Sequence, residues 1–290
     1  MKILNKYRKM DSWFQVRYSF NPYRGCEHGC IYCDGRSNCY WPRGGNEQFS
    51  TKIWVKLNAP YLLRKELAKI RGREPTAVGG GVTDIYQPCE EKYEVTRKCL
   101  EVLARVKYPS HLMTKSSLIL RDVDILKELS EDNWCFVSVS FSTVDDSIAK
   151  IFEPRCSPPS VRLDVVSKLN REGVKTGITF MPILPFITDS GEQLEGAFRE
   201  FKRADAKYVI VGSLTLRDFQ QNYFMKVLAA HCPDIVLKYN KLYKNGYSPI
   251  PSYVKKLYTK TNRLSEKYSI PPKMPRFFQI NKQVQKKLVL

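Results

Sequence analysis

The stretch Asn21-Pro-Tyr-Arg-Gly-Cys26-Glu-His-Gly-Cys30-Ile-Tyr-Cys33 places three thiols within eight residues, directly after a predicted strand at residues 13–20. Thiolates are ligands of iron–sulfur clusters and also of zinc. Three thiolates leave one iron of a four-iron cluster open to a further ligand, whereas a fourth ligand such as Cys39 makes the site closed and structural. The spacing therefore predicts a metal centre, with a zinc knuckle as the alternative to iron and sulfur.

The composition excludes several classes of protein. The chain has 290 residues, of which 43% are apolar, and this suits one large α/β domain with an appendage. No apolar run reaches transmembrane length, and the charged N-terminus lacks the apolar segment of a signal peptide. We therefore expect a soluble, cytoplasmic protein without a membrane partner. Nine cysteines, an odd number, argue against a disulfide framework, and only three histidines disfavour His-rich zinc chemistry.

Strand and helix patterns alternate along residues 1–235. The predicted strands are 13–20, 76–82, 110–115, 135–142, 174–182 and 207–213. The predicted helices are 90–105, 122–129, 160–171, 192–204 and 217–230. Repeated strand–helix units imply a parallel sheet with right-handed crossovers. We predict an α/β fold with a partial (β/α)6 TIM-like barrel.

The fourth predicted strand indicates what fills this barrel. Val137, Val139 and Phe141 point to one face, and Ser138, Ser140 and Ser142 point to the other. Under a layer of helices, the apolar set faces outward and the serines line a polar interior. The alternative is an edge strand with its serines in water. The interior is favoured because parallel strands are usually covered on both faces.

Residues 236–290 differ from the rest in composition and charge. They hold 13 Lys and Arg against one acid, so they carry 12 of the 19 net positive charges. We predict a basic extension packed on the barrel, with a helix at 252–267. Its cations can neutralise phosphates and its tyrosines can stack on bases, which favours a nucleic-acid partner. Alternatively, the tyrosines pin the extension to the barrel. The tyrosines concerned are Tyr239, Tyr243, Tyr247, Tyr253, Tyr258 and Tyr268.

The C-x3-C-x2-C spacing after a first barrel strand resembles the signature of the radical S-adenosylmethionine superfamily. The resemblance implies that Cys26, Cys30 and Cys33 hold a [4Fe–4S] cluster whose open iron binds the amino and carboxylate groups of S-adenosylmethionine. It also implies reductive cleavage to methionine and a 5′-deoxyadenosyl radical, which abstracts hydrogen from a substrate. An electron donor such as flavodoxin or ferredoxin is the implied partner.

Flanking motifs resemble one branch of that superfamily, the spore photoproduct lyase-like or DNA repair photolyase-like proteins. The motifs are Asn21–Cys26, Gly81-Val-Thr-Asp-Ile-Tyr-Gln-Pro88, Thr114-Lys-Ser116 and Glu153-Pro-Arg155 followed by Ser157-Pro158. This branch implies a nucleic-acid substrate, such as damaged DNA. Two alternatives stay open: a radical enzyme acting on a small molecule or protein, and a nucleic-acid-binding module with a structural metal.

The resemblance also implies roles for single residues around the cofactor. Tyr32 is expected near the adenine, Gly80 and Gly81 near the methionine amino group, and Thr83 and Asp84 beside the cofactor. Lys115, Ser140 and Arg155 are expected near its carboxylate, with Thr179 and Met181 near the ribose or adenine. The alternatives are a packing aromatic at Tyr32, a bulge at the glycines, a surface lysine at Lys115, and an Arg155–Glu153 ion pair.

One position departs from the pattern of the lyases. They carry a hydrogen-donating cysteine just ahead of a Thr-Ser-Asp stretch, where this chain has Gly81. Cys89 lies nearby in the sequence but is not equivalent. The substrate and the step that quenches the radical are therefore open. We expect Cys99, Cys135, Cys156 and Cys232 to be buried thiols.

Overall fold

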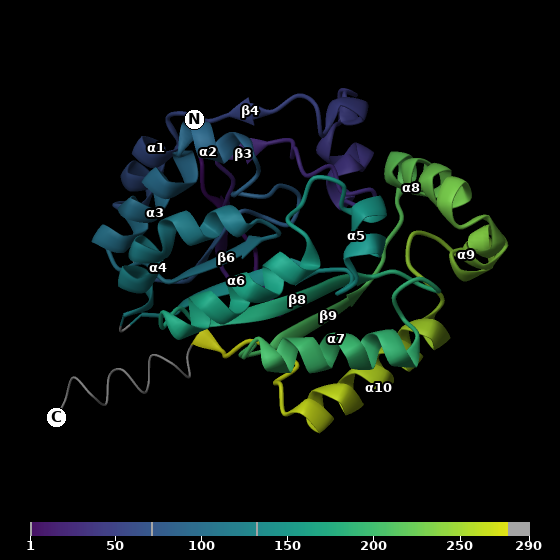
Figure 1. The fold of residues 1–290 in the computed structure, drawn as a ribbon. Helices are drawn as coiled ribbons and strands as arrows, with labels where there is room; N and C mark the ends of the chain where they lie inside the picture. The colour runs from purple at the N-terminus through teal and green to yellow at the C-terminus, as the bar shows by residue number, and fades with distance from the viewer. Residues whose placement is uncertain (1, 71, 132, 278–290) are drawn as a thin grey trace.

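A seven-stranded sheet forms the centre of the molecule in a computed structural model that describes residues 2–70, 72–131 and 133–277 (Figure 1). The strand order is β1-β2-β5-β6-β7-β8-β9. The strands are β1 (Asn5–Lys6), β2 (Tyr18–Phe20), β5 (Thr76–Val78), β6 (Ser110–Thr114), β7 (Cys135–Phe141), β8 (Thr176–Ile183) and β9 (Val209–Ser213). All neighbours pair in parallel except β1 and β2. The sheet curves without closing, so the predicted partial barrel is confirmed.

Helices pack against the outer face of the sheet and around the ends of its strands. They are α1 (Ala59–Leu67), α2 (Cys89–Tyr93), α3 (Val95–Arg105), α4 (Val123–Ser130), α5 (Asp146–Phe152), α6 (Pro159–Arg171), α7 (Gly191–Arg203), α8 (Asp218–His231), α9 (Val236–Leu242) and α10 (Pro251–Tyr268). Beside the sheet, β3 (Tyr23–Arg24) and β4 (Trp54–Val55) form a short antiparallel ribbon. No helix in the described ranges combines the length and the apolar character needed to cross a membrane.

The first predicted strand and first predicted helix are both too long. Asp11 accepts hydrogen bonds from the amides of Trp13 (2.9 Å) and Phe14 (2.7 Å), and this turn delays β2 until Tyr18. Glu94 adopts a left-handed conformation with φ of 51°, which separates α2 from α3. Such a conformation cannot continue a right-handed helix.

The two faces of β7 have the predicted environments. Val137, Val139 and Phe141 lie in the main apolar core with side chains of α3, α4, α6 and α7. On the other face, the Ser138 hydroxyl lies 2.8 Å from both His111 Nε2 and the Tyr208 hydroxyl. The serine face is therefore a polar interior and not a solvated edge.

Aromatic side chains fill the end of the barrel where the parallel strands begin. Trp134, Phe136 and Tyr208 pack there with Met274 and Phe277 of the C-terminal segment. The Trp134 ring contacts the Phe136 ring edge-on, with 5.1 Å between centroids. This end holds a packed core, so an active site must lie elsewhere.

The C-terminal segment lies against α7 and β9. Tyr253 donates a hydrogen bond to Asp189 at 2.8 Å, Tyr268 donates one to Glu195 at 3.2 Å, and Lys267 pairs with the same glutamate. Tyr239 and Tyr243 are buried and stacked 5.8 Å apart. These tyrosines take part in packing, so the prediction that they stack on bases is wrong for the buried pair. Residues 278–290 of the predicted extension lie outside the described residues.

Candidate active site

The three-cysteine loop lies where β2 ends, at the carboxyl ends of the parallel strands. Cys26 and Cys30 are buried and Cys33 is half-buried. Two glycines with positive φ shape the loop, Gly25 at 84° and Gly29 at 64°. A Cβ atom at Gly25 would lie 2.7 Å from the Lys52 carbonyl oxygen, and one at Gly29 would lie 2.8 Å from Arg155 Nη2. Both positions therefore require glycine.

The segment after β5 holds this loop in place. Thr83 donates its hydroxyl proton to the Gly25 carbonyl, and Gln87 Nε2 donates to the same oxygen at 3.3 Å. The Glu27 amide donates to Gln87 Oε1 at 2.9 Å, and the Cys89 amide donates to Glu27 Oε2 at 2.6 Å. Thr83, expected beside the cofactor, therefore acts on the cysteine loop, and Cys89 is tied to that loop through its backbone.

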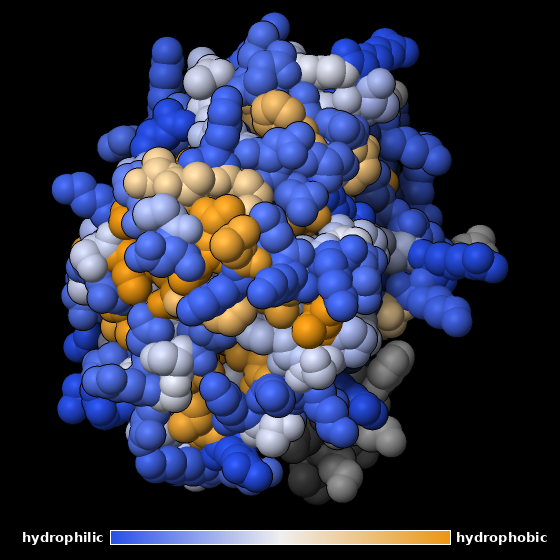
Figure 2. All heavy atoms as spheres, turned by 90° about the vertical axis from the view of Figure 1, so that its right-hand side faces the viewer, coloured by the Kyte–Doolittle hydropathy of each residue, from blue (hydrophilic) through white to orange (hydrophobic). Residues whose placement is uncertain are grey.

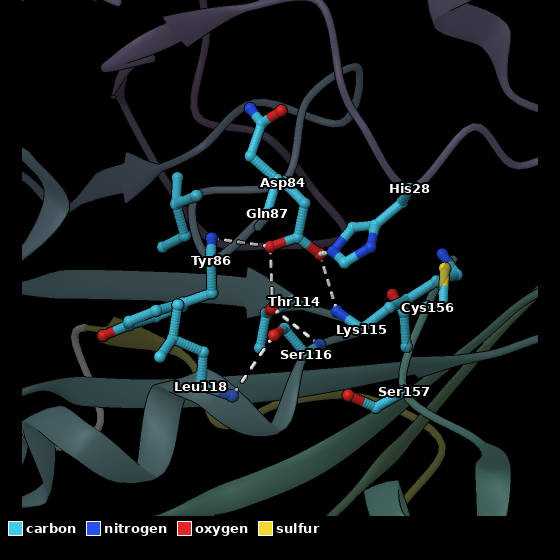
Figure 3. A network of polar contacts seen from close by, with 12 residues as sticks. His28, Asp84, Tyr86, Gln87, Thr114, Lys115, Ser116, Leu118, Cys156 and Ser157 are labelled. Atoms are coloured by element: carbon cyan, nitrogen blue, oxygen red, sulfur yellow. Dashed lines mark hydrogen bonds and ion pairs between the residues drawn. The ribbon is translucent and has the colours of Figure 1, made fainter. Parts of the chain in front are cut away.

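Asp84 joins the cysteine loop to the end of β6 (Figure 3). Its carboxylate accepts hydrogen bonds from Thr114 Oγ1 at 2.7 Å, the Tyr86 amide at 2.8 Å and the Lys115 amide at 2.7 Å. His28 Nε2 lies 3.3 Å from Oδ2 of the same carboxylate. Burial alone would raise the pKa of Asp84, but His28 and these donors lower it below its ordinary value. Asp84 is thus a buried carboxylate that orients two loops.

A second buried network fixes Tyr32 and surrounds Lys115. Glu153 accepts hydrogen bonds from the Tyr32 hydroxyl and from Ser142 Oγ (3.0 Å), and it pairs with Arg162. Lys115 Nζ lies 5.7 Å from the centre of the Tyr32 ring. Burial alone would lower the pKa of Lys115, but Cys30 and Glu153 raise it. Lys115 is therefore a cation held inside the site and not a surface lysine, and Arg162 takes the carboxylate considered for Arg155.

The cysteine thiols are near one another and near positive charge. Burial is the largest influence on Cys33 and raises the pKa of its thiol to about 12, while Lys115 and Arg36 oppose this rise. The hydrogen bond from Cys156, whose sulfur lies 3.5 Å from Cys30 Sγ, together with Lys115 lowers the pKa of Cys30 to about 7. Metal binding requires thiolates, so these cations favour the ligating form.

The donor set of the loop is the type that an iron–sulfur cluster takes, with one thiolate on each of three irons. Cys39 is exposed, and its sulfur accepts a hydrogen bond from Ser37 Oγ at 3.2 Å.

An unpaired hydroxyl faces the barrel interior beside this loop. Gly81 has φ of 57°, and no atom lies within 4 Å of the position that a Cβ would take. The Gly80 amide donates to Asn21 Oδ1 at 2.9 Å. Ser140 of β7 stands opposite Thr179 of β8, whose buried hydroxyl has no partner among the described residues. A polar ligand could satisfy that hydroxyl, so the interior fits a cofactor.

Arg155 and Met181, which the resemblance places near the cofactor, make these contacts within the chain. The exposed Arg155 donates from Nη2 to the Ser50 carbonyl at 3.1 Å, and its own carbonyl oxygen lies 2.9 Å from His28 Nδ1. A cavity of about 420 Å³ separates it from Ser116 and Ser117, with Cys156 in its wall. Met181 packs against Gly212, where a Cβ would lie 2.6 Å from its Cγ.

Four residues of the site were missed by sequence reasoning: His28, Arg36, Cys156 as a neighbour of Cys30, and Arg162. His28 lies inside the quoted motif, and Arg36 follows it by three residues, so their proximity to the loop was a usable signal. Arg162 lies on the inward face of α6, where a charge in an apolar stripe indicates a buried partner.

Comparison with known proteins identifies the family. The model of the radical SAM superfamily matches residues 20–219. The chain belongs to the radical SAM superfamily. Uncharacterised proteins of Mycobacterium tuberculosis and Mycobacterium bovis are 32% identical over 255 residues, covering 88% of this chain and 75% of theirs. A radical SAM Nα-GlyT isomerase of Pseudomonas phage M6 is 25% identical over 194 residues, covering 66% of this chain and 38% of that protein.

Solved structures show the same fold. A spore photoproduct lyase mutant with bound AdoMet and dinucleoside spore photoproduct superposes with a TM-score of 0.67 at 17% identity, covering 91% of this chain and 78% of that one. The peptide-bound SuiB of Streptococcus suis superposes with a TM-score of 0.51 at 16% identity, covering 79% of this chain and 47% of that one. The radical SAM chain described here is therefore an enzyme with the fold of this superfamily.

Proposed function

We propose that this enzyme holds a [4Fe–4S] cluster on Cys26, Cys30 and Cys33 and uses S-adenosylmethionine to abstract hydrogen from a substrate. The observation that carries the proposal is the three-thiol loop, fixed by Thr83, Gln87 and Glu27 at the end of a polar barrel interior. Once bound and reduced by one electron, this pair of cofactors supplies an organic radical. The residues of the chain bind and orient these cofactors.

Each of these residues has its own role in binding or enclosing the cofactor. Lys115 presents its ammonium to the carboxylate of the cofactor, because it is half-buried at the site and has no carboxylate ion pair of its own among the described residues. Gly81 leaves the backbone accessible, beside a Gly80 amide that Asn21 holds, and the Ser140 and Thr179 hydroxyls face the interior. Tyr32 is fixed by Glu153, so its ring covers one side of the site and excludes water there.

The test is product formation by the reconstituted protein. With dithionite and no other substrate, slow release of 5′-deoxyadenosine is expected. Lys115→Ala should weaken S-adenosylmethionine binding by about ten- to a hundredfold, since removing a charge-assisted hydrogen bond costs about 1.5–3 kcal/mol. Lys127→Ala is the matched control, because Lys127 is exposed and pairs with the exposed Glu172. A fully loaded cluster that releases no 5′-deoxyadenosine would refute the proposal.

We further propose that the substrate is a nucleic acid. Exposed cations of α10 support this, namely Lys255, Lys256, Lys260 and Arg263. A second basic surface lies on the β3–β4 ribbon beside the cysteine loop. There Trp54 is 40% exposed, with Arg24 at 5.6 Å and Lys52 at 5.3 Å from its ring. An exposed indole among cations suits a stacked base next to a neutralised phosphate.

Salt dependence separates the two basic surfaces. Reversing the charge of Lys255, Lys256 and Lys260 should reduce the log–log salt slope for single-stranded DNA by about 0.7 for each phosphate that the variant no longer neutralises. Trp54→Ala should instead weaken binding by about 1–3 kcal/mol with little change of slope. Absence of oligonucleotide binding at low salt would remove the nucleic-acid assignment and favour a small molecule or protein as substrate.

We also propose where an acidic electron carrier, such as flavodoxin, docks. Figure 2 shows a broad apolar area on the face formed by α8 and α9, where Leu237 is 72% and nearby Phe186 is 42% exposed. Buried side chains of these helices share one core with Cys30, Ile31 and Tyr32. Exposed lysines lie on the same two helices, at positions 226, 238 and 241, and they complement an acidic surface.

Reduction by two agents tests this docking face. Leu237→Glu combined with Lys238→Glu should slow cluster reduction by flavodoxin, while reduction by dithionite, a small anion that needs no docking, stays unchanged. Equal flavodoxin rates for wild type and variant would exclude this face. A variant that dithionite also reduces slowly would show damage to the site and not to docking.

A further inference from the structure

Arg36 is a buried cation next to the cysteine loop. It ends the short 3-10 helix Asp34–Arg36 directly after Cys33, and its side chain is 2% exposed. Its Nε donates to the Cys30 carbonyl at 3.2 Å and its Nη2 donates to the Gly29 carbonyl at 2.9 Å. The guanidinium lies 4.0 Å from the Tyr223 ring and 5.2 Å from the Phe49 ring.

A second fully buried arginine, Arg162, shows what Arg36 lacks. Arg162 is 0% exposed and is neutralised by the equally buried Glu153. In the described ranges, Arg36 forms no ion pair with any carboxylate, and its hydrogen-bond acceptors are two neutral carbonyl oxygens. A charge buried without a partner is strongly unfavourable. The neutral contacts of Arg36 therefore do not offset the free-energy cost of burying its charge.

We infer that Arg36 is the fixed counter-charge of the cluster bound by Cys26, Cys30 and Cys33, and that it raises the reduction potential of that cluster. The inference rests on the proposed function. Three thiolates give the bound cluster a net negative charge, and reduction adds one more. A fixed positive charge in a buried site stabilises the reduced state more than the oxidised one, and net charge is one of the determinants of iron–sulfur potentials.

The geometry explains why the residue is arginine. Its guanidinium is flat enough to lie against the rings of Tyr223 and Phe49, and it donates two hydrogen bonds in fixed directions. Because both acceptors belong to the loop that carries the cysteines, Arg36 is a positioning residue that acts on the cluster through charge.

Two variants separate charge from shape. Arg36→Gln keeps a hydrogen-bond donor and removes the charge, whereas Arg36→Lys keeps the charge and removes the planar group. The measurement is the midpoint potential of the reconstituted protein, followed by EPR without S-adenosylmethionine, together with iron content. Arg36→Gln should shift the one-electron equilibrium about tenfold toward the oxidised cluster, about 59 mV. Arg36→Lys should retain most of the wild-type potential, and the exposed Arg199→Gln should retain all of it.

Potential and iron content together show whether the charge of Arg36 acts on the cluster. An Arg36→Gln protein with full iron and an unchanged potential would overturn the inference. Equal loss of iron from the Gln and Lys variants would also overturn it, because shape and not charge would then be decisive. Loss of iron from the Gln variant alone would support it. Failure of the proposed function looks different, since the wild-type protein itself would then show no EPR signal of a reduced cluster.

Discussion

The two ends of the barrel are built from different kinds of residue. Where the parallel strands begin, Trp134, Phe136 and Tyr208 close the interior with apolar packing. Where they end, charged side chains are buried instead, with Asp84 and Glu153 each accepting several hydrogen bonds. The apolar packing where the strands begin stabilises the fold, whereas burying polar groups where they end costs stability. This difference locates the chemistry, as barrel enzymes generally build their sites at the carboxyl ends of strands.

A single strand shows the transition. On β7, Ser138 belongs to the lower network with His111 and Tyr208, whereas Ser142, directly after the strand, donates to Glu153. The same residue type on the same face is used first to fill the interior and then to fix a functional carboxylate.

The largest expected effect is at the upper end. Cys30→Ala removes a direct ligand, as Cys26→Ala and Cys33→Ala do, so each should abolish cluster assembly and 5′-deoxyadenosine release. Iron and sulfide analysis after anaerobic reconstitution measures this. The exposed Cys39→Ala is the control and should keep its iron. Severe iron loss from the Cys39 variant would contradict the open, three-ligand site.

At the lower end, Trp134→Ala should lower the free energy of unfolding by about 3–5 kcal/mol, because it leaves a cavity among Phe136 and Phe277. Chemical denaturation measures this decrease. The iron content of the folded fraction should match wild type. Iron loss in proportion to the decrease in stability would mean that the two ends are not separate in function.

A smaller effect comes from a buried histidine of the lower end. Burial lowers the pKa of His111 to about 3 from an ordinary 6.5. Between those pH values the unfolded chain binds a proton that the folded chain does not, so stability falls as pH falls. The slope contributed is about 1.4 kcal/mol per pH unit. His111→Gln keeps a partner for Ser138 and should remove this slope between about pH 6 and 4.5. Parallel pH profiles of wild type and variant would contradict a buried, neutral His111.

The smallest expected effect is that of Tyr208→Phe. The Tyr208 hydroxyl donates to the Val137 carbonyl at 3.1 Å and lies 2.8 Å from Ser138 Oγ. Its removal should cost about 1–2 kcal/mol of unfolding free energy with S-adenosylmethionine affinity unchanged. Weaker cofactor binding in this variant would extend the functional region down to the lower network.

Sequence patterns predicted the barrel well because its strands and helices bury long periodic faces. All six predicted strands are present, and α6, α7 and α10 begin and end within one residue of the prediction. The elements that were missed are short or lack a regular apolar face, as in α1, α5, α9 and the β3–β4 ribbon. Their formation depends on tertiary contacts, which no local pattern reports.

For the site, the sequence identified the residue types better than their partners. The cysteine loop, Asp84 and Lys115 were predicted as parts of one site, and the structure brings them together. The hydrogen bond from Thr83 to Gly25 joins residues that are 58 positions apart in the chain, and Glu153 pairs with Arg162, 9 positions away, in place of Arg155. Both choices depend on how the loops pack against each other. Such choices are decided by burial, because a fully enclosed carboxylate takes the partner that is enclosed with it.

The edge of the sheet at β9 has a consequence for solubility. The outward amide of Val209 donates to the Pro271 carbonyl at 2.9 Å. Pro271 and Pro272 have no N–H groups, so this segment accepts a bond from the edge and cannot extend the pairing as a further strand. It therefore shields an edge that would otherwise be a template for a strand of another molecule. The proline pair thus opposes aggregation in a sheet whose barrel never closes.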